Sequence, residues 1–230
     1  MEVLRLAKDR DRRLRQGHVW IYSNEVDNEE TPLKGFPAGQ AVQIENAQGR
    51  WLGSGYVNPN SLICARIVSR DRKVILDGSL FAHRIKVALG LREKLYPEPY
   101  YRLLFGEADG VPGLVVDRYG DYLVVQITTA GIEALREALV DALVRVLRPR
   151  GIILRNDSSI RELEGLPRYV EVVHGDVPDY VPLTEGGCRF EVSVHEGQKT
   201  GWFFDQAANR DAFVRLVDGK RVLDVCSYVG

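Results

Sequence analysis

Hydrophobic and polar positions divide the chain into three stretches with different periods. From residue 1 to about 73, short runs of alternating apolar and polar residues are separated by turns rich in Gly and Asn. This pattern predicts a small all-β unit, a compact barrel. The expected strands are 3–6, 18–22, 41–45, 51–56 and 62–69, with a hairpin turn at 46–49.

Residues from about 77 to 184 contain both the two-residue period of strands and the 3.6-residue period of helices. This mixture predicts a central α/β domain, a sheet covered by helices. Helical spacing predicts a helix that Asp77 or Ser79 caps and that runs to about residue 95, and a second one between 132 and 147. The expected strands are 101–105, 114–117, 122–127, 152–154, 170–173 and 180–183.

The last stretch, 185–230, predicts the start of a third unit. Alternation over 188–195 indicates a half-buried strand, and Asp205 would cap the helix that follows. Asp218 and Gly219 end that helix, and 222–225 is a short apolar strand interrupted by Asp224. The apolar face of the expected helix consists of Ala208, Ala212, Phe213, Leu216 and Val217.

Composition places the chain among ordinary globular proteins. Its 230 residues are 45% hydrophobic and 27% charged with a net charge of −1, so two or three small domains are expected. The three cysteines are far apart, which argues against a disulfide framework and for a reducing cytoplasm. Neither cysteines nor histidines have metal-ligand spacing, and no apolar run has the length of a membrane span.

The region around Asp224 carries the candidate chemistry. An acidic residue near the carboxyl end of the first strand of a doubly wound sheet, followed by a Gly-bearing loop, suits a nucleoside-carrying ligand. The dinucleotide fingerprint differs, because its glycines cradle a diphosphate that a carboxylate would repel. S-adenosylmethionine carries a sulfonium and an ammonium group, so it suits this position better.

Two segments carry a family resemblance. GQKTGWFFDQAANR (197–210) and VLDVCSYVG (222–230) resemble the PUA-containing, S-adenosylmethionine-dependent 23S rRNA (cytosine-5) methyltransferases. Patterns in the first 73 residues resemble the PUA domain of this family, and 104–121 resembles its central domain. Two features depart from the family pattern: Ala207 stands in place of Arg, and the loop reads Cys-Ser-Tyr-Val-Gly (226–230) in place of Phe-Ser-Tyr-Thr-Gly.

The resemblance implies a multidomain α+β and α/β protein. Residues 1–73 would be a PUA-like RNA-binding β-barrel, 77–184 a central α/β domain, and 185–230 an incomplete, doubly wound methyltransferase domain. The expected cofactor contacts are Asp224, Ser227 and Gly230 in the loop and, on the opposite wall, Lys199, Thr200, Phe203 and Asp205. For this wall a purely structural role is equally open, in the turn, the helix cap or packing.

A PUA-like domain implies ribosomal RNA as partner, and a basic stretch near the N-terminus supports this expectation. Lysine and arginine bind phosphates regardless of sequence, whereas Asp9 and Asp11 interleave this stretch and leave a solvated face as the alternative. Trp20 and Tyr22 are expected in the core rather than as stacking platforms. The loop 155–161 could also meet RNA or be an ordinary loop. The expected RNA-binding residues are Lys8, Arg10, Arg12, Arg13 and Arg15.

Methylation of cytosine C5 requires a nucleophilic thiolate that adds to C6. Cys64, Cys188 and Cys226 are poor candidates, and Cys226 is expected to be a packing residue. The resemblance implies that the catalytic cysteines and an Asp-Pro-Pro loop lie beyond residue 230, with no catalytic residue in this chain. The acidic residues Glu107, Asp109 and Asp117 are interpreted as parts of a rigid turn.

From these features we expect a fragment that does not itself methylate RNA. Its unpaired apolar strand would be a template for association, with a homodimer as one outcome. The main alternative is a non-catalytic module for RNA binding or ribosome assembly. A nicotinamide-dependent oxidoreductase is disfavoured, because Asp224 replaces the first glycine of the G-x-G-x-x-G loop.

Overall fold

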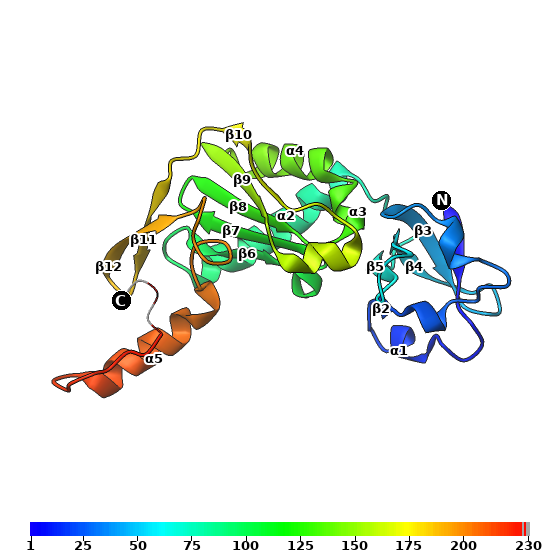
Figure 1. The fold of residues 1–230 in the computed structure, drawn as a ribbon, viewed down its shortest axis with the longest axis horizontal. Helices are drawn as coiled ribbons and strands as arrows, with labels where there is room; N and C mark the ends of the chain where they lie inside the picture. The colour runs from blue at the N-terminus through cyan, green and yellow to red at the C-terminus, as the bar shows by residue number, and fades with distance from the viewer. Residues whose placement is uncertain (227, 229–230) are drawn as a thin grey trace.

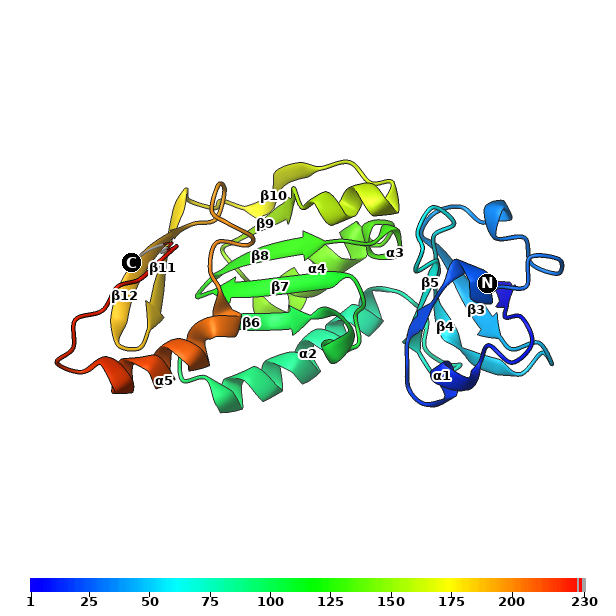
Figure 2. The same ribbon diagram turned by 60° about the horizontal axis from the view of Figure 1, so that its bottom comes forward.

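A computed structural model describes residues 1–226 and 228 of the chain. An N-terminal β unit and a central α/β unit lie side by side along the long axis of the molecule (Figure 1). A β-hairpin and a last helix lie at the opposite end from the N-terminal unit, and the rotated view shows the same order (Figure 2).

The N-terminal unit is a five-stranded sheet in the order β1-β3-β4-β5-β2, in which only the β1–β3 pair is parallel. Leu4, Val42 and Ile44 alternate with more exposed residues and lie fully buried in one core, as the period predicted. The elements are β1 (Glu2–Arg5), α1 (Arg12–Arg15), β2 (Trp20–Ile21), η1 (Ser23–Glu25), η2 (Leu33–Gly35), β3 (Gln40–Glu45), β4 (Trp51–Val57) and β5 (Ala65–Ser69).

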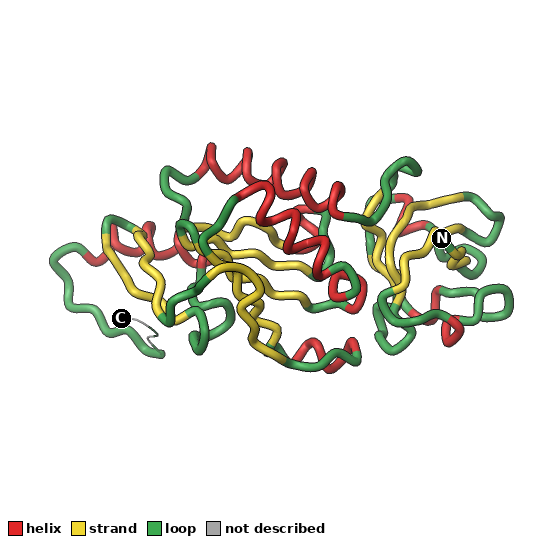
Figure 3. Tube along the Cα trace, turned by 90° about the horizontal axis from the view of Figure 1, so that it is seen from above, coloured by secondary structure: helices red, strands yellow, loops and turns green. Residues whose placement is uncertain are grey.

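The central unit is a five-stranded sheet in the order β10-β9-β8-β7-β6, in which β8 and β9 are parallel and the other pairs antiparallel. Helices α2 and α4 cover one face of this sheet (Figure 3). The elements are α2 (Gly78–Leu95), β6 (Tyr100–Phe105), η3 (Gly106–Asp109), β7 (Leu114–Tyr119), β8 (Tyr122–Ile127), α3 (Ala130–Glu133), α4 (Arg136–Leu147), β9 (Gly151–Asn156), η4 (Ser159–Glu164) and β10 (Tyr169–Gly175).

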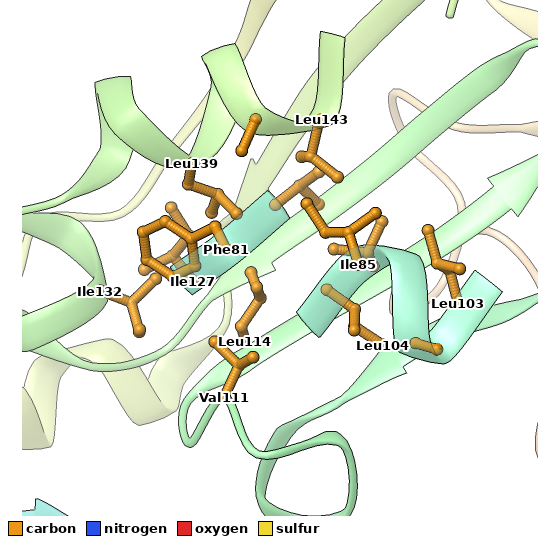
Figure 4. Packing of buried hydrophobic residues seen from close by; sticks show 14 of the residues in the cluster. Phe81, Ile85, Leu103, Leu104, Val111, Leu114, Ile127, Ile132, Leu139 and Leu143 are labelled. Atoms are coloured by element: carbon orange, nitrogen blue, oxygen red, sulfur yellow. The ribbon is translucent and has the colours of Figure 1, made fainter. Parts of the chain in front are cut away.

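The core between the helices and the sheet is apolar. Phe81 and Ile85 of α2 and Leu139 and Leu143 of α4 belong to one buried cluster with Leu114 of β7 (Figure 4). Each of these five side chains is at most 2% exposed, so hydrophobic burial holds the helices on the sheet.

Both expected helices of this unit are present, but the second is broken. Asp77 caps α2 as expected, with its Oδ1 accepting hydrogen bonds from the backbone N–H groups of Ser79 and Leu80. The second helix divides into α3 and α4 at Leu135, whose ψ of 17° lies outside the helical range. Ile132 before the break and Leu139 after it are both buried, so the apolar spacing could not reveal the break.

The strand expected at 180–183 was wrongly placed in the central sheet. It is β11 (Tyr180–Glu185), which pairs antiparallel with β12 (Cys188–Ser193) in a separate two-stranded hairpin. Gly186 and Gly187 connect the two strands with φ values of 59° and 78°. Two consecutive residues with positive φ are typical of the type I′ turn, which matches the twist of a hairpin.

The expected strand at 222–225 was also wrong. The structure assigns no strand there, and Leu223 is 86% exposed. Within the described residues no strand pairs with this segment, and a β-strand needs a neighbour for its backbone hydrogen bonds.

The helix before this segment, α5 (Ala207–Val217), ends at Asp218 as predicted. It has no buried residue, however, and Leu216 on its expected apolar face is 75% exposed. Asp205 does not cap it, because Asp205 lies in the preceding 3-10 turn, η5 (Phe204–Gln206).

Buried polar contacts join the N-terminal unit to the central unit. The Oη of Tyr56 in β4 donates a hydrogen bond of 2.7 Å to the carbonyl of Pro112. The amide of Asn58 donates to Glu164 Oε2 at 2.8 Å, and Arg66 forms an ion pair with the same carboxylate. Because these groups are buried, separating the two units would leave several of them without partners.

Candidate functional site

The face of the central sheet opposite the helices receives the chain after β12. Val124 of β8 is the register partner of both Asp117 of β7 and Ile153 of β9, so these three side chains point to the same face. Val124 and Ile153 pack there against a cluster that includes Val192 of β12 and Trp202. The sheet therefore supports the segment 197–203, which we call the cofactor segment because it contains most of the expected cofactor wall.

Asp117 is the polar centre of this contact. It is fully buried, and Arg102 donates two hydrogen bonds to its carboxylate, at 2.9 and 3.0 Å. The Oγ1 of Thr200 donates a third, at 2.5 Å, and the Oη of Tyr119 donates to the backbone carbonyl of Thr200 at 3.0 Å. Burial raises the pKa of Asp117, while the hydrogen bonds from Arg102 and Thr200 act in the opposite direction. The prediction of a rigid turn is wrong for Asp117, which lies in strand β7, where its carboxylate is bound by Arg102 and Thr200.

Arg155 of β9 makes a second polar contact with the same region of the chain. Its guanidinium donates to the backbone carbonyls of Val194 and Gly197, each at 2.9 Å. It also forms an ion pair with Asp157, while the arginine itself is only 3% exposed. Both acceptors are backbone carbonyls, one just before the cofactor segment and one at its first residue. Arg155 therefore fixes the path of the chain where this segment begins.

The RNA contacts considered for 155–161 are therefore wrong at three positions. Arg155, Asn156 and Arg161 are at most 3% exposed. The side chain of Asn156 accepts a hydrogen bond from the backbone of Ile127, and Arg161 pairs with Glu133. The sequence signal was misleading, because these three side chains are buried and bind backbone or carboxylate groups of the protein itself.

On the other side of the cofactor segment, Glu185 in the hairpin holds two side chains of the GQKTGWFFDQAANR motif. Trp202 donates its indole N–H to Glu185 at 2.9 Å. Arg210 donates to both carboxylate oxygens, at 2.5 and 2.9 Å, and lies over the Trp202 ring. These motif residues thus attach the start of α5 to the hairpin.

Between these attachments, part of the cofactor segment is open to solvent. Lys199 is exposed, and its Nζ lies 4.3 Å from the centre of the Phe203 ring, a cation–π geometry. The Tyr228 ring packs edge-on against Phe203, with ring centres 5.9 Å apart, and its Oη accepts a hydrogen bond from the Gln198 N–H. The fold therefore brings Tyr228, a described residue of the 222–230 motif, against the cofactor segment.

The structure divides the expected cofactor residues into three groups. Thr200 is 1% exposed and its hydroxyl is used by Asp117, so it is part of the support rather than an open wall. The side chains of Lys199, Asp205 and Asp224 are exposed, and Phe203 is half-buried. Ser227 and Gly230 lie outside the described residues.

The five expected RNA-binding residues lie on or beside α1. Lys8, Arg10 and Arg12 are exposed and make no ion pair within the described part of the chain. The other two are held by carboxylates, Arg13 by Glu25 and Arg15 by Asp11.

The two aromatic residues near this stretch are half-buried rather than fully enclosed in the core. Tyr22 lies beneath the guanidinium of Arg13, with 5.1 Å between the guanidinium carbon and the ring centre. Trp20 donates its indole N–H to Glu107 of the central unit at 2.6 Å. Both aromatic rings are therefore occupied by protein contacts.

Other arginines, which the sequence pattern did not indicate, lie close to the basic stretch at residues 8–15. Arg70 follows β5 and donates to the backbone carbonyl of His18, close to the basic stretch in space. Arg72 lies over the Trp51 ring, 5.1 Å from its centre. Arg50, Arg70 and Arg72 are exposed. Asn46, in the turn before Arg50, donates to Asp11 beside α1, and Arg70 binds His18, so the fold brings this turn and the end of β5 near the basic stretch.

The three cysteines differ in environment. Cys64 is fully buried, and burial raises the pKa of its thiol to about 12, which removes it as a nucleophile at neutral pH. Cys188 and Cys226 are exposed. The expectation that Cys226 is a packing residue is therefore wrong.

Two kinds of feature are absent from the described residues. No cluster of three or more His, Cys, Asp or Glu side chains is arranged to hold a metal ion in that part of the chain. No helix there combines the length and apolarity needed to cross a membrane.

Comparison of the sequence with known proteins identifies relatives. Residues 4–70 match the family model of the PUA-like domain. The chain is 38% identical over 229 residues to a protein named Ribosomal RNA large subunit methyltransferase I from Aliivibrio fischeri, and 38% identical to the protein of that name from Erwinia tasmaniensis. Both matches cover 98% of this chain and 57% of the relative, so the chain spans little more than half the length of these relatives.

Solved structures give the same fold. A protein from Streptococcus mutans described as a SAM-dependent methyltransferase matches with a TM-score of 0.75 over 94% of this chain and 54% of its own, at 19% identity. A methyltransferase structure described as complexed with SAH matches with a TM-score of 0.77 at 20% identity. The PUA-like domain and the α/β fold expected from the sequence are thus confirmed. Over nearly its whole length the chain is thus similar to proteins named as ribosomal RNA methyltransferases, and residues 4–70 form a PUA-like domain.

Proposed function

We propose that this chain is part of an S-adenosylmethionine-dependent methyltransferase of ribosomal RNA. The observation that carries the proposal is the contact of Tyr228 with Gln198 and Phe203, because it joins the two motifs expected to bind the cofactor. The names of the curated relatives support RNA methyl transfer, and the PUA-like domain supports RNA binding.

In this proposal the open part of the cofactor segment contributes one wall of the cofactor site. Phe203 offers an apolar ring, while Asp205 and Asp224 offer exposed carboxylates that could accept hydrogen bonds from hydroxyl or ammonium groups. S-adenosylmethionine would supply an electrophilic methyl group on its sulfonium. The exposed residues suit this ligand, since both carboxylates complement its positive charge.

The RNA surface in this proposal is the exposed side of α1 and its surroundings. Lys8, Arg10 and Arg12 have their charges available for phosphates, and Arg70 and Arg72 extend the same surface. Arg13 and Arg15 would contribute only after release from their carboxylate partners.

The finer assignment is methylation of cytosine C5 in 23S rRNA in the cytoplasm. This reaction needs a thiolate. We place it outside the 230 residues, because Cys64 is buried and the chain spans only 57% of the length of its named relative. In this proposal another strand pairs with 222–225 and completes the sheet of the methyltransferase domain. The alternative is that two chains associate through this segment.

A methyl-transfer assay tests this function. The protein expressed from its full reading frame is incubated with S-adenosylmethionine labelled in the methyl group and with unmodified 23S or 16S rRNA. Label in 23S rRNA alone, located at C5 of a cytosine by mass spectrometry, is the expected result. RNA binding without transfer to either RNA would instead support the non-catalytic assembly module.

A further inference from the structure

We propose that Asp117, Tyr119 and Arg155 of the central unit are positioning residues that hold the cofactor segment in its binding shape. The inference rests on the proposed function, and it reassigns Thr200 from a ligand of the cofactor to an anchor of the segment. None of the three positioning residues lies in the two motifs that mark the cofactor site.

The first anchor is a hydrogen-bond network around Thr200. Asp117 accepts from the Thr200 hydroxyl at 2.5 Å, and Tyr119 donates to the Thr200 carbonyl at 3.0 Å. Asp117, Tyr119 and Thr200 are each at most 1% exposed, so water cannot replace these contacts. Moving Thr200 away would leave buried polar groups unpaired, which is costly in a protein interior.

The second anchor lies at the start of the segment. Arg155 binds the carbonyls of Val194 and Gly197 from within β9. Its own position is fixed by burial and by the ion pair with Asp157. Gly197 and Thr200, three residues apart, are thus both attached to the central sheet.

The backbone beside the Thr200 anchor has unusual φ angles. Lys199 has a φ of 53°, in the left-handed region that residues with a side chain seldom adopt. Gly201 has a φ of 108°, and a Cβ there would lie 2.9 Å from Val192 Cγ1. Such backbone conformations persist where surrounding contacts impose them, and here the anchors direct Lys199 towards Phe203 and solvent.

Two variants remove single hydroxyl groups with little change of volume. Tyr119→Phe keeps the ring that packs against Phe204 but loses the bond to the Thr200 carbonyl. Thr200→Val loses the bond to Asp117, and Thr200→Ser is the matched control, because it retains the hydroxyl.

The first measurement is the rate of trypsin cleavage after Lys199, which reports the order of the segment without any cofactor. It is made on the protein expressed from its full reading frame, and mass spectrometry identifies the cut. We expect cleavage at least tenfold faster in Thr200→Val and in Tyr119→Phe, with Thr200→Ser close to the unchanged protein. Unchanged cleavage in both variants would overturn the inference.

The second measurement is the KM for S-adenosylmethionine in the methyl-transfer assay. If the anchors position the segment, KM rises at least fivefold in Thr200→Val while kcat at saturation stays within twofold, and Thr200→Ser restores KM. A fall in kcat with KM unchanged would argue against positioning. If no variant, including the unchanged protein, binds S-adenosylhomocysteine in calorimetry, the proposed function fails, whereas the cleavage rates still decide whether the anchors hold the segment.

Discussion

Arg66 of β5 and Glu164 of η4 form an ion pair across the boundary between the PUA-like domain and the central domain. Arg66 Nη1 lies 3.1 Å from Glu164 Oε1, and the two side chains are 11% and 3% exposed. The other oxygen of Glu164 accepts hydrogen bonds from Asn58 at 2.8 Å and from the backbone of Ala130 at 3.3 Å. One carboxylate therefore collects donors from both domains and fixes their relative position.

Removal of this carboxylate should destabilise the protein strongly. Glu164→Ala leaves the Arg66 guanidinium and the Asn58 amide buried without their partner, and breaking a buried pair in this way costs about 3–5 kcal/mol of unfolding free energy. Urea unfolding followed by circular dichroism measures the loss. Glu162→Ala is the matched control, since Glu162 lies in the same 3-10 helix with a side chain that is 64% exposed. Equal stability of the two variants would show that the pair does not join the domains.

Asp224 should contribute to cofactor affinity. Its carboxylate is exposed in the motif that contacts the cofactor segment, so Asp224→Ala should weaken binding of S-adenosylhomocysteine at least tenfold, about 1.4 kcal/mol. Calorimetry on the protein expressed from its full reading frame gives the dissociation constant. Asp218→Ala, at the end of α5, controls for the loss of one negative charge. An unchanged constant for Asp224→Ala would remove this residue from the site.

Charge reversal on α1 should weaken RNA binding in a salt-dependent way. In Arg10→Glu/Arg12→Glu, two exposed cations are lost, and the slope of log affinity against log salt should fall by about one unit per lost phosphate contact. Fluorescence anisotropy with an rRNA fragment at several salt concentrations measures the slope. Lys86→Glu on the exposed side of α2 is the control. Identical slopes for both variants would support the solvated-face alternative.

The thiols should react at two distinct rates. At pH 8, the exposed Cys188 and Cys226 should react rapidly with a disulfide reagent. Burial raises the pKa of Cys64 to about 12, which keeps its thiol protonated at pH 8, so it should react only after unfolding in guanidinium. In Cys64→Ala the slow reaction should disappear, and in Cys188→Ala one rapid thiol should be lost. Three rapid thiols in the folded protein would contradict the burial of Cys64.

Several features of the fold could be predicted because neighbouring residues decide them. The α2 helix begins at Asp77, whose side chain satisfies backbone N–H groups within the next turn. The alternation in β3 buries Val42 and Ile44, as a two-residue period requires. The motif of the cofactor segment was also visible in sequence, although it left open whether Thr200 binds the cofactor or has a structural role.

Other features depended on partners that are distant along the chain. β11 was assigned to the wrong sheet, because its pattern does not say which strand it pairs with, and the Gly186–Gly187 turn favours the local hairpin. The segment 222–225 has the pattern of a strand but no neighbouring strand among the described residues. Arg155 was considered for RNA because a charged residue is usually exposed, whereas here it is buried with partners.

The sequence by itself determined the periods of most elements, the cap of α2 and the two motifs of the candidate cofactor site, since each depends on residues close together in the chain. Only the tertiary structure decided which of those motif residues face solvent. Thr200 and Lys199 are adjacent, yet one is buried against Asp117 and the other is exposed beside Phe203. Asp117 precedes Thr200 by 83 residues, and a contact over that separation is set by the packing of the whole sheet rather than by any local pattern.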